Sequence, residues 1–410
     1  MRSCVLRLYF LNSRIWNSGL EFQNLYIFLG VRGFFYRDCP VKPDNDTRLR
    51  NSRIWNSKIK FCFQKVIKHF YNSLAIYKKG AKMLKKTLLS GLGAAVICAS
   101  ASAASLTGVG ATFPMPIYKE LSKIYYEQTK NEVSYSGGGS GKGIASISAK
   151  NGDFGGSDEP LTQEVLKEKN LVQFPAVIGA VVLGYNLDGI KDLRLDPRVL
   201  AMIYSGEITK WDDMKIKALN PSIKLPNADI IVIVRSDASG TTFNFTNYLA
   251  NDEKWKYKYG VAKSINWEAK VTPVASNPLM ATMIEKTPFS IGYLEYSYAK
   301  NMGLASLKNS ENEYITPSPA SFAVASKNAN FSAENGFYKI LTNASGKGSY
   351  PLVGASFILL HKEGKNNKEV AKFFNWAMSD EKALNATRKL GYEPIDENTA
   401  KMVKEYLDKQ

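Results

Sequence analysis

Three short segments of the chain combine glycine with hydroxyl side chains directly before an expected helix. They are Gly108–Pro114, Ser136–Gly143 and Arg235–Thr242. A helix N-terminus exposes unpaired N–H groups and the positive end of the helix dipole, so it suits an anion. Glycine lets the backbone approach a ligand closely, and Ser and Thr add O–H donors. One such turn is a common way to begin a helix. Three in one chain, one of them with Arg and Asp, favour an anion-binding site over ordinary helix caps.

The second of these turns is similar in composition to a nucleotide-binding loop, but its residues do not fit one. Ser136 stands where a P-loop has its first glycine, and Gly143 replaces the Ser or Thr that would hold Mg²⁺. A dinucleotide motif that begins at Gly137 fails because Lys142 takes the position of the last glycine. We therefore expect no nucleotide cofactor, and we expect no other cofactor.

A carboxylate stands in a further loop of small residues. Asp158 lies in the segment Asp153–Pro160, which is rich in Gly and Ser. As a structural residue it would cap the segment that begins at Pro160. Near an anion, a carboxylate is useful only if it accepts a hydrogen bond from an oxygen that carries a proton.

Side chains for covalent chemistry are scarce in residues 104–410. All four cysteines precede this part, and His361 is its only histidine. This composition predicts no metal site built from several His or Cys residues. A Ser-His-Asp triad would have to use His361, and no G-x-S-x-G motif accompanies it. We interpret His361 as a solvated residue at the end of a strand, so the sequence favours a binding protein over an enzyme.

Short apolar runs alternate with amphipathic stretches in residues 104–410, which indicates an α/β fold with mostly parallel sheets and helices on their faces. Strands are expected at Leu106–Val109, Val133–Ser136, Ala176–Tyr185, Ile230–Val234, Ile291–Tyr293 and Ser356–Leu360. Helices are expected at Pro116–Thr129, Gly143–Lys150, Pro197–Ser205, Thr241–Ala250, Ser276–Glu285, Lys368–Ser379 and Thr399–Lys409. The extended segments Val177–Tyr185 and Ser356–Leu360 could cross between two lobes.

The net charge of the chain is unevenly distributed. The 410 residues include 54 Lys and Arg against 37 Asp and Glu, a formal charge of +17 that would suit nucleic acid or an anionic membrane. Residues 1–82 hold 16 basic and 4 acidic residues, whereas residues 104–410 hold 36 and 33. The body of the protein is therefore near neutral, and we expect no nucleic-acid partner for it.

Residues 83–103 have the layout of a secretory signal peptide. Met83 is followed by Lys85 and Lys86, by a stretch of apolar and small residues, and by Ala101-Ser102-Ala103 as a cleavage signal. Ile97 precedes Cys98 where a lipid-attachment motif needs a small residue, so we expect no lipid anchor.

The 82 residues before this segment do not have the pattern of a domain. The heptapeptide NSRIWNS occurs twice within them, and no helical or strand period is sustained. Our hypothesis is that residues 1–82 are upstream sequence read in frame and that synthesis starts at Met83. N-terminal sequencing of the native protein tests this, and any peptide from 1–82 would contradict it. A basic nucleic-acid-binding repeat is the alternative.

A set of segments in residues 104–410 resembles one known family. In order, they are SLTGVGATFP, NGDFGGSDEPLT, FPAVIGAVVLGYN, YSGEITKWDD, LNPSIKLP, RSDASGTTFNFTNYL, IGYLEYSYAK and FILLHKEG. Together they are similar to the periplasmic phosphate-binding proteins of bacterial high-affinity phosphate ABC transporters. Residues 1–82 have no counterpart in this resemblance.

The resemblance implies a two-lobed periplasmic-binding-protein fold of type II. Each lobe would be a mixed, mostly parallel sheet flanked by helices, with the ligand in the cleft between them. Residues 104–186 plus 354–410 would form lobe one, and residues 187–353 would form lobe two. The family further implies a monomer in the periplasm that binds inorganic phosphate with high affinity and delivers it to the permease subunits of an ABC transporter, without enzymatic activity.

The family's phosphate ligands match nine positions of this chain. They are Thr112, Phe113, Ser140, Asp158, Arg235, Asp237, Ser239, Gly240 and Thr241. Phe113 would act through its backbone N–H, and Asp237 would pair with Arg235 and orient it. Asp158 would select for a ligand O–H, which sulfate lacks.

The chain also departs from the family pattern. Many members have a glycine-rich stretch where this chain has Val274–Pro278, so we assign no ligand there. Another oxyanion as the ligand, or a secreted phosphatase, remain the alternatives.

Overall fold

The structure, a computed structural model, describes residues 105–409, so the expectations for residues 1–82 and 83–103 lie outside the described part. The described residues form an α/β fold built on one long mixed sheet with the strand order β2-β1-β3-β12-β4-β8-β6-β7. These strands are β1 (Ser105–Gly110), β2 (Glu132–Gly137), β3 (Phe154–Ser157), β4 (Leu171–Tyr185), β6 (Ile231–Arg235), β7 (Val271–Val274), β8 (Ser290–Glu295) and β12 (Val353–His361).

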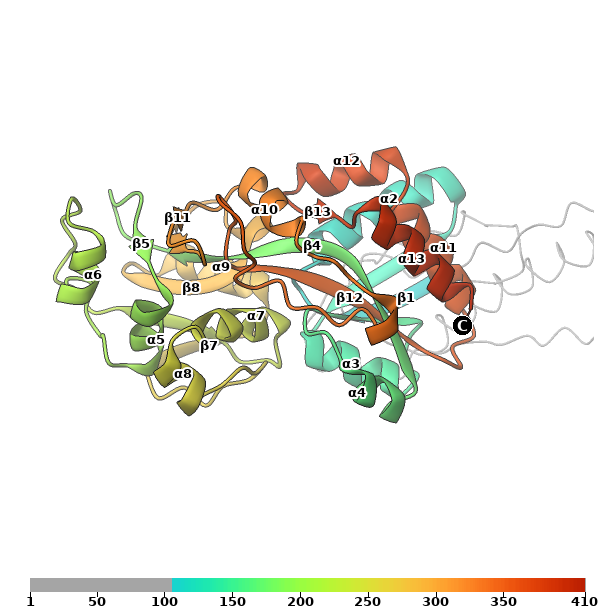
Figure 1. Ribbon diagram of the computed structural model, residues 1–410, viewed down its shortest axis with the longest axis horizontal. Coiled ribbons are helices and arrows are strands. Elements are labelled where there is room, and N and C mark those ends of the chain that lie inside the picture. Colours follow the sequence, from blue (N-terminus) through green and yellow to red (C-terminus); the bar gives the residue numbers. More distant parts are fainter. Residues whose placement is uncertain (1–104, 410) are drawn as a thin grey trace, which may run out of the picture. The chain divides into compact units, whose positions relative to one another are not determined.

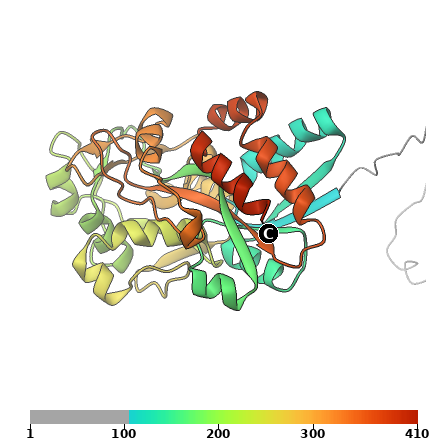
Figure 2. The ribbon, with the colours of Figure 1, turned by 45° about the vertical axis from the view of Figure 1, so that its right-hand side comes forward.

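Two strands join the halves of this sheet. β4 pairs antiparallel with β12 along Leu171–Ala180 and then antiparallel with β8 along Val181–Tyr185. In Figures 1 and 2, β4 (green) and β12 (orange-red) run between two groups of helices. Both strands are apolar over almost their whole length, which is typical of strands covered on both faces. They correspond to the two segments that we expected to cross between lobes.

The outer parts of the sheet are parallel. β1 pairs parallel with β2 and β3, and β6 pairs parallel with β7 and β8. The helices around the first part are α2 (Met115–Thr129), α3 (Ser140–Ser148), α4 (Gln163–Glu168), α11 (Asn367–Ala377), α12 (Glu381–Lys389) and α13 (Glu397–Leu407). Those around the second are α5 (Pro197–Ser205), α6 (Met214–Leu219), α7 (Gly240–Leu249), α8 (Glu253–Lys258), α9 (Asn277–Lys286) and α10 (Pro319–Ser326).

Smaller elements complete the described part. β5 (Arg194–Leu195), β10 (Ser306–Lys308) and β11 (Tyr314–Ile315) form a separate three-stranded sheet. β9 (Gly303–Leu304) and β13 (Glu393–Pro394) add to β4. None of the helices within residues 105–409 is long and apolar enough to span a bilayer.

All strands and helices expected from the sequence are present, with shifts at their ends. The best match is α5, Pro197–Ser205, whose ends carry the usual signals: Asp196 caps it, Pro197 opens it, and Gly206 follows it with φ 84°. The sheet is mixed, because the long strands β4 and β12 are antiparallel to their neighbours.

Candidate functional site

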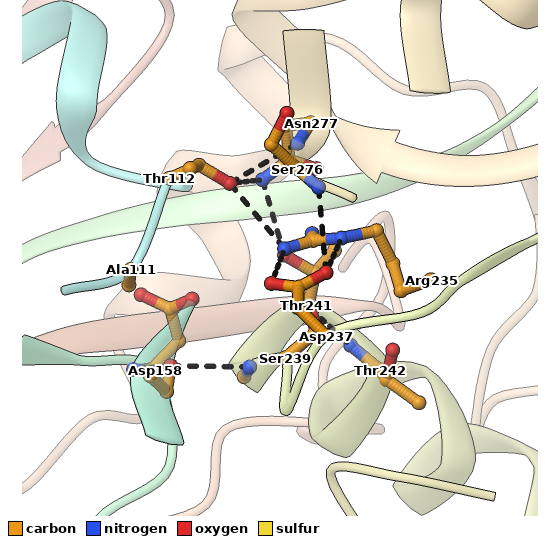
Figure 3. A network of polar contacts seen from close by, with 12 residues as sticks. Ala111, Thr112, Asp158, Arg235, Asp237, Ser239, Thr241, Thr242, Ser276 and Asn277 are labelled. Atoms are coloured by element: carbon orange, nitrogen blue, oxygen red, sulfur yellow. Dashed lines mark hydrogen bonds and ion pairs between the residues drawn. The ribbon is translucent and has the colours of Figure 1, made fainter. Parts of the chain in front are cut away.

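All three small-residue turns follow a strand directly and open a helix. The first connects β1 to α2, the second connects β2 to α3, and the third connects β6 to α7. Parallel strands place such turns at one edge of a sheet, which is where ligands bind in open α/β sheets. The second and third turns touch each other, because the N–H of Gly141 donates to the carbonyl of Ala238 at 2.9 Å. Residues from distant parts of the chain therefore meet at one place, shown in Figure 3.

Arg235 lies at the centre of this place with its side chain almost fully buried. Its Nε donates to Asp237 Oδ1 at 2.7 Å, and its Nη2 donates to Asp237 Oδ2 at 2.6 Å. The expected pairing is thus present as a two-bond fork, which holds the guanidinium in one orientation. The two terminal nitrogens of the guanidinium also reach two hydroxyls, since Nη1 lies 3.3 Å from Thr241 Oγ1 and Nη2 lies 3.5 Å from Thr112 Oγ1.

Ser140 joins the second turn to the third turn and to Asp158. Its Oγ accepts hydrogen bonds from the N–H groups of Asp158 and Gly240, both at 3.1 Å. Ser239 caps α7, since its Oγ accepts from the N–H of Thr242 at 3.2 Å. The first N–H groups of α3 and α7 have no carbonyl of their own helix to bind, which leaves those of Ser140 and Thr241 to a ligand.

Asp158 follows β3 and is only 2% exposed. Within the described residues its Oδ1 has no hydrogen-bond partner. Burial raises the pKa of this carboxyl to about 7, while the nearby Ser356 hydroxyl and the charge of Arg235 partly offset the rise. Asp158 is therefore a buried group with an open acceptor and a proton exchangeable near neutral pH.

The backbone of the first turn is fixed by two tyrosines. Tyr298 OH donates to the carbonyl of Thr112, and Tyr392 OH donates to the carbonyl of Phe113, both at 2.7 Å. In a planar trans peptide the C=O and the next N–H point in opposite directions. Holding the carbonyl of Thr112 therefore also fixes the direction of the Phe113 N–H.

The structure brings all nine expected site residues together, and it adds one that the sequence reasoning did not assign. Asn277, at the start of α9, contacts both Thr112 Oγ1 and Thr241 Oγ1 (Figure 3). The signal for Asn277 in the sequence was weak. It is a polar residue directly before Pro278, near the start of the expected helix Ser276–Glu285.

His361 does not have the solvated position that we expected. It is 6% exposed at the end of β12, and its Nδ1 accepts from the N–H of Glu363 at 3.2 Å. The strand carries it inward because β12 is buried along its whole length. Within residues 105–409, no group of three or more His, Cys, Asp or Glu side chains could hold a metal ion.

Comparisons with known proteins agree with this architecture. The sequence profile of the PBP superfamily domain matches residues 99–381. Phosphate-binding protein PstS of Haemophilus influenzae is 44% identical over 312 residues, which cover 74% of this chain and 92% of that protein. Its counterpart in Pasteurella multocida is 41% identical over 329 residues, which cover 78% and 95%.

A solved structure supports the fold. A high-affinity periplasmic phosphate-binding protein, PfluDING, bound with phosphate, superposes with a TM-score of 0.60 at 19% identity, covering 73% of this chain and 93% of that one. That identity bears on the fold alone, whereas the two relatives and the profile bear on the family. The chain therefore belongs to the PBP superfamily and, within it, to the family of the phosphate-binding protein PstS, as the sequence motifs indicated.

Proposed function

We propose that this protein binds inorganic phosphate in the site around Arg235 and Asp158 and delivers it to the permease of an ABC transporter for import. The observation that carries this proposal is the buried Asp158 carboxyl, which faces the site with an open acceptor beside the helix N-termini and the arginine. A tetrahedral oxyanion that keeps a proton near neutral pH fits this combination of many donors and one acceptor.

The donors of the site would hold the oxygens of phosphate. We assign the hydroxyls of Thr112, Ser140, Ser239 and Thr241, the backbone N–H groups of Phe113, Ser140, Gly240 and Thr241, and the guanidinium of Arg235 as the donors. Asp237 orients Arg235 through its fork of two bonds. In the described arrangement, the N–H of Gly240 donates to Ser140 Oγ. This N–H and the Ser140 hydroxyl therefore lie side by side at the start of α7.

Asp158 would provide selectivity between oxyanions. A carboxylate accepts the O–H of phosphate, whereas sulfate brings only acceptors and leaves the buried carboxylate unpaired. An unpaired buried acceptor costs about 1–3 kcal/mol, and more when it is charged. A site built to pair a substrate hydroxyl can reject an analogue that lacks it by roughly 10⁴-fold.

We propose residues 104–186 plus 354–410 as lobe one and residues 187–353 as lobe two. β4 supports this division, since it leaves β12 and joins β8 at Val181. We also propose that the protein works as a monomer in the periplasm after removal of a signal peptide, with transmembrane permease subunits as partners, and that it performs no covalent chemistry on phosphate.

Isothermal titration calorimetry tests the proposal. The purified protein should bind phosphate tightly and sulfate weakly, with arsenate as the third ligand because it shares the charge and proton of phosphate. Asp158→Asn should narrow the preference for phosphate over sulfate. An unchanged preference would contradict the role of Asp158, and absent phosphate binding by the unaltered protein would contradict the function itself.

A phosphate-release assay separates binding from catalysis. We expect no release of phosphate from phosphomonoesters, with or without divalent metal ions. Release that depends on Arg235 or Asp158 would favour the phosphatase alternative.

A further inference from the structure

Asn277 lies completely buried between two hydroxyls of the site. Its Nδ2 is 3.2 Å from Thr112 Oγ1 and 3.2 Å from Thr241 Oγ1. Its backbone N–H also donates to Thr112 Oγ1, at 3.1 Å. Thr112 follows β1 and Thr241 belongs to α7, so this one residue connects the two halves of the sheet at the site.

The orientation of the Asn277 amide is set by a backbone group. The N–H of Glu295 donates to Asn277 Oδ1 at 3.1 Å. A backbone N–H can only donate, so the atom that faces it must be the amide oxygen. The two N–H bonds of Nδ2 are thereby directed toward Thr112 and Thr241, and a rotated amide would place donor against donor at Glu295.

This arrangement determines what the two hydroxyls can do. A hydroxyl oxygen has two lone pairs and one hydrogen. Thr112 Oγ1 accepts from the backbone N–H and from Nδ2 of Asn277, at 3.1 and 3.2 Å, with Arg235 Nη2 as a more distant donor at 3.5 Å. Thr241 Oγ1 accepts from Asn277 Nδ2 and, at 3.3 Å, from Arg235 Nη1. With both lone pairs engaged, each hydroxyl has only its O–H left to offer a ligand.

We propose that Asn277 is a positioning residue that commits the hydroxyls of Thr112 and Thr241 to donation, so that this side of the site accepts only ligand oxygens without a proton. Figure 3 shows Asp158 apart from Asn277 and Thr112. The two groups together would fix the orientation of phosphate, with its O–H toward Asp158 and unprotonated oxygens toward the threonines. The inference rests on the proposed phosphate-binding function and adds a specificity-determining residue to it.

A double-mutant cycle in phosphate affinity tests the proposal on the full chain. Asn277→Ala should weaken phosphate binding about tenfold or more, since each of the two buried hydroxyls loses its bond from Nδ2, whereas the bonds from Arg235 and from the backbone N–H of residue 277 remain. In a protein that already carries Thr112→Val and Thr241→Val, the same change should cost less than about threefold, because there are no hydroxyls left to orient. A merely structural role for Asn277 would cost the same in both backgrounds.

Asn220 supplies the matched control. It is a buried asparagine whose Nδ2 donates twice, to the carbonyls of Arg194 and Ile216, and whose Oδ1 accepts the N–H of Arg194. Asn220→Ala removes an equally saturated amide elsewhere and should leave phosphate affinity unchanged when circular dichroism shows a folded protein. If Asn277→Ala does not fold, the uncharged Asn277→Leu, which is similar in size to asparagine and has no hydrogen-bonding group, replaces it in the cycle.

The outcomes are distinct. Unaltered protein that binds no phosphate would remove the proposed function. Unaltered protein that binds phosphate, together with equal costs of the Asn277 change in both backgrounds or with no cost at all, would overturn this inference alone.

Discussion

Replacing Asp158 by Asn should change how the stability of the protein depends on pH. The carboxyl has its pKa raised from 3.8 to about 7 by burial, so between these values the folded state keeps a proton that the unfolded chain releases. The folded state then binds more protons, and the free energy of unfolding falls as pH rises through this window. Below about pH 4 the group is neutral in both states, and above about pH 7 the destabilisation is complete.

The size of the effect follows from the shift. About three pKa units correspond to roughly 4 kcal/mol, as an upper bound for a buried carboxyl that must ionise without a partner. Small and medium-sized proteins have a total free energy of unfolding of about 5–15 kcal/mol, so the ionisation of this one carboxyl would remove a large share of it. An amide in place of the carboxyl has no proton to release. The variant Asp158→Asn should therefore match the unaltered protein near pH 4 and exceed its free energy of unfolding by up to roughly 4 kcal/mol at pH 8.

Urea unfolding without phosphate, at several pH values from 4 to 8, measures this difference. Glu295 is a second buried carboxyl, with a pKa raised to about 8 by burial, but both proteins carry it and its contribution largely cancels in the difference. Asp188→Asn is the control, because it makes the same change at an exposed position. A difference between Asp158→Asn and the unaltered protein that stays constant over the whole pH range would refute the reasoning.

Three further changes test the backbone and the charges of the site. Ser276 has φ 79° and ψ 156°, a region that favours glycine, so Ser276→Gly should raise the free energy of unfolding by about 1 kcal/mol in urea titrations. A Cβ on Gly139 would collide with Asp237 Oδ2 and lie 2.9 Å from the carbonyl oxygen of Ala238. Gly139→Ala should therefore keep the second and third turns apart and weaken phosphate binding about tenfold or more by calorimetry; unchanged affinity would show that this contact is not needed. Arg235→Lys keeps the charge but loses the fork to Asp237, and we expect an affinity loss of roughly 100-fold, whereas near-normal binding would show that charge alone suffices.

Much of the fold could be predicted because its long elements carry regular apolar patterns and end signals. β3 was missed for a physical reason. Its sequence, Phe154–Ser157, contains two glycines and has little strand propensity, yet it is fully buried. The glycines are needed because α3 lies against them, and a Cβ on Gly155 would be 2.7 Å from the carbonyl of Gly143. Such close packing between elements leaves no periodic signal in the sequence.

The parts of the site that lie in short local motifs could be predicted from the sequence. The three turns and the Asp158 loop can each be recognised from the composition of a few consecutive residues. Asn277 does not, because its role depends on Thr112, 165 residues away in the chain, and on an amide orientation imposed by the backbone of Glu295. These contacts exist only once the sheet has brought β1, α9 and β8 together.

The charges of the site also explain why its selectivity would not follow from attraction to anions in general. Arg235 carries the positive charge, but Asp237 neutralises it through two short bonds. A site with an unbalanced arginine would hold any oxyanion of suitable size. Here Asp237 balances the charge of Arg235. The other carboxylate of the site, Asp158, can form a hydrogen bond only with a ligand that carries a proton. Binding would then depend on directed N–H and O–H donors, and the choice of ligand on where its single proton lies, which agrees with a near-neutral body of the protein despite the formal charge of +17 for the whole chain.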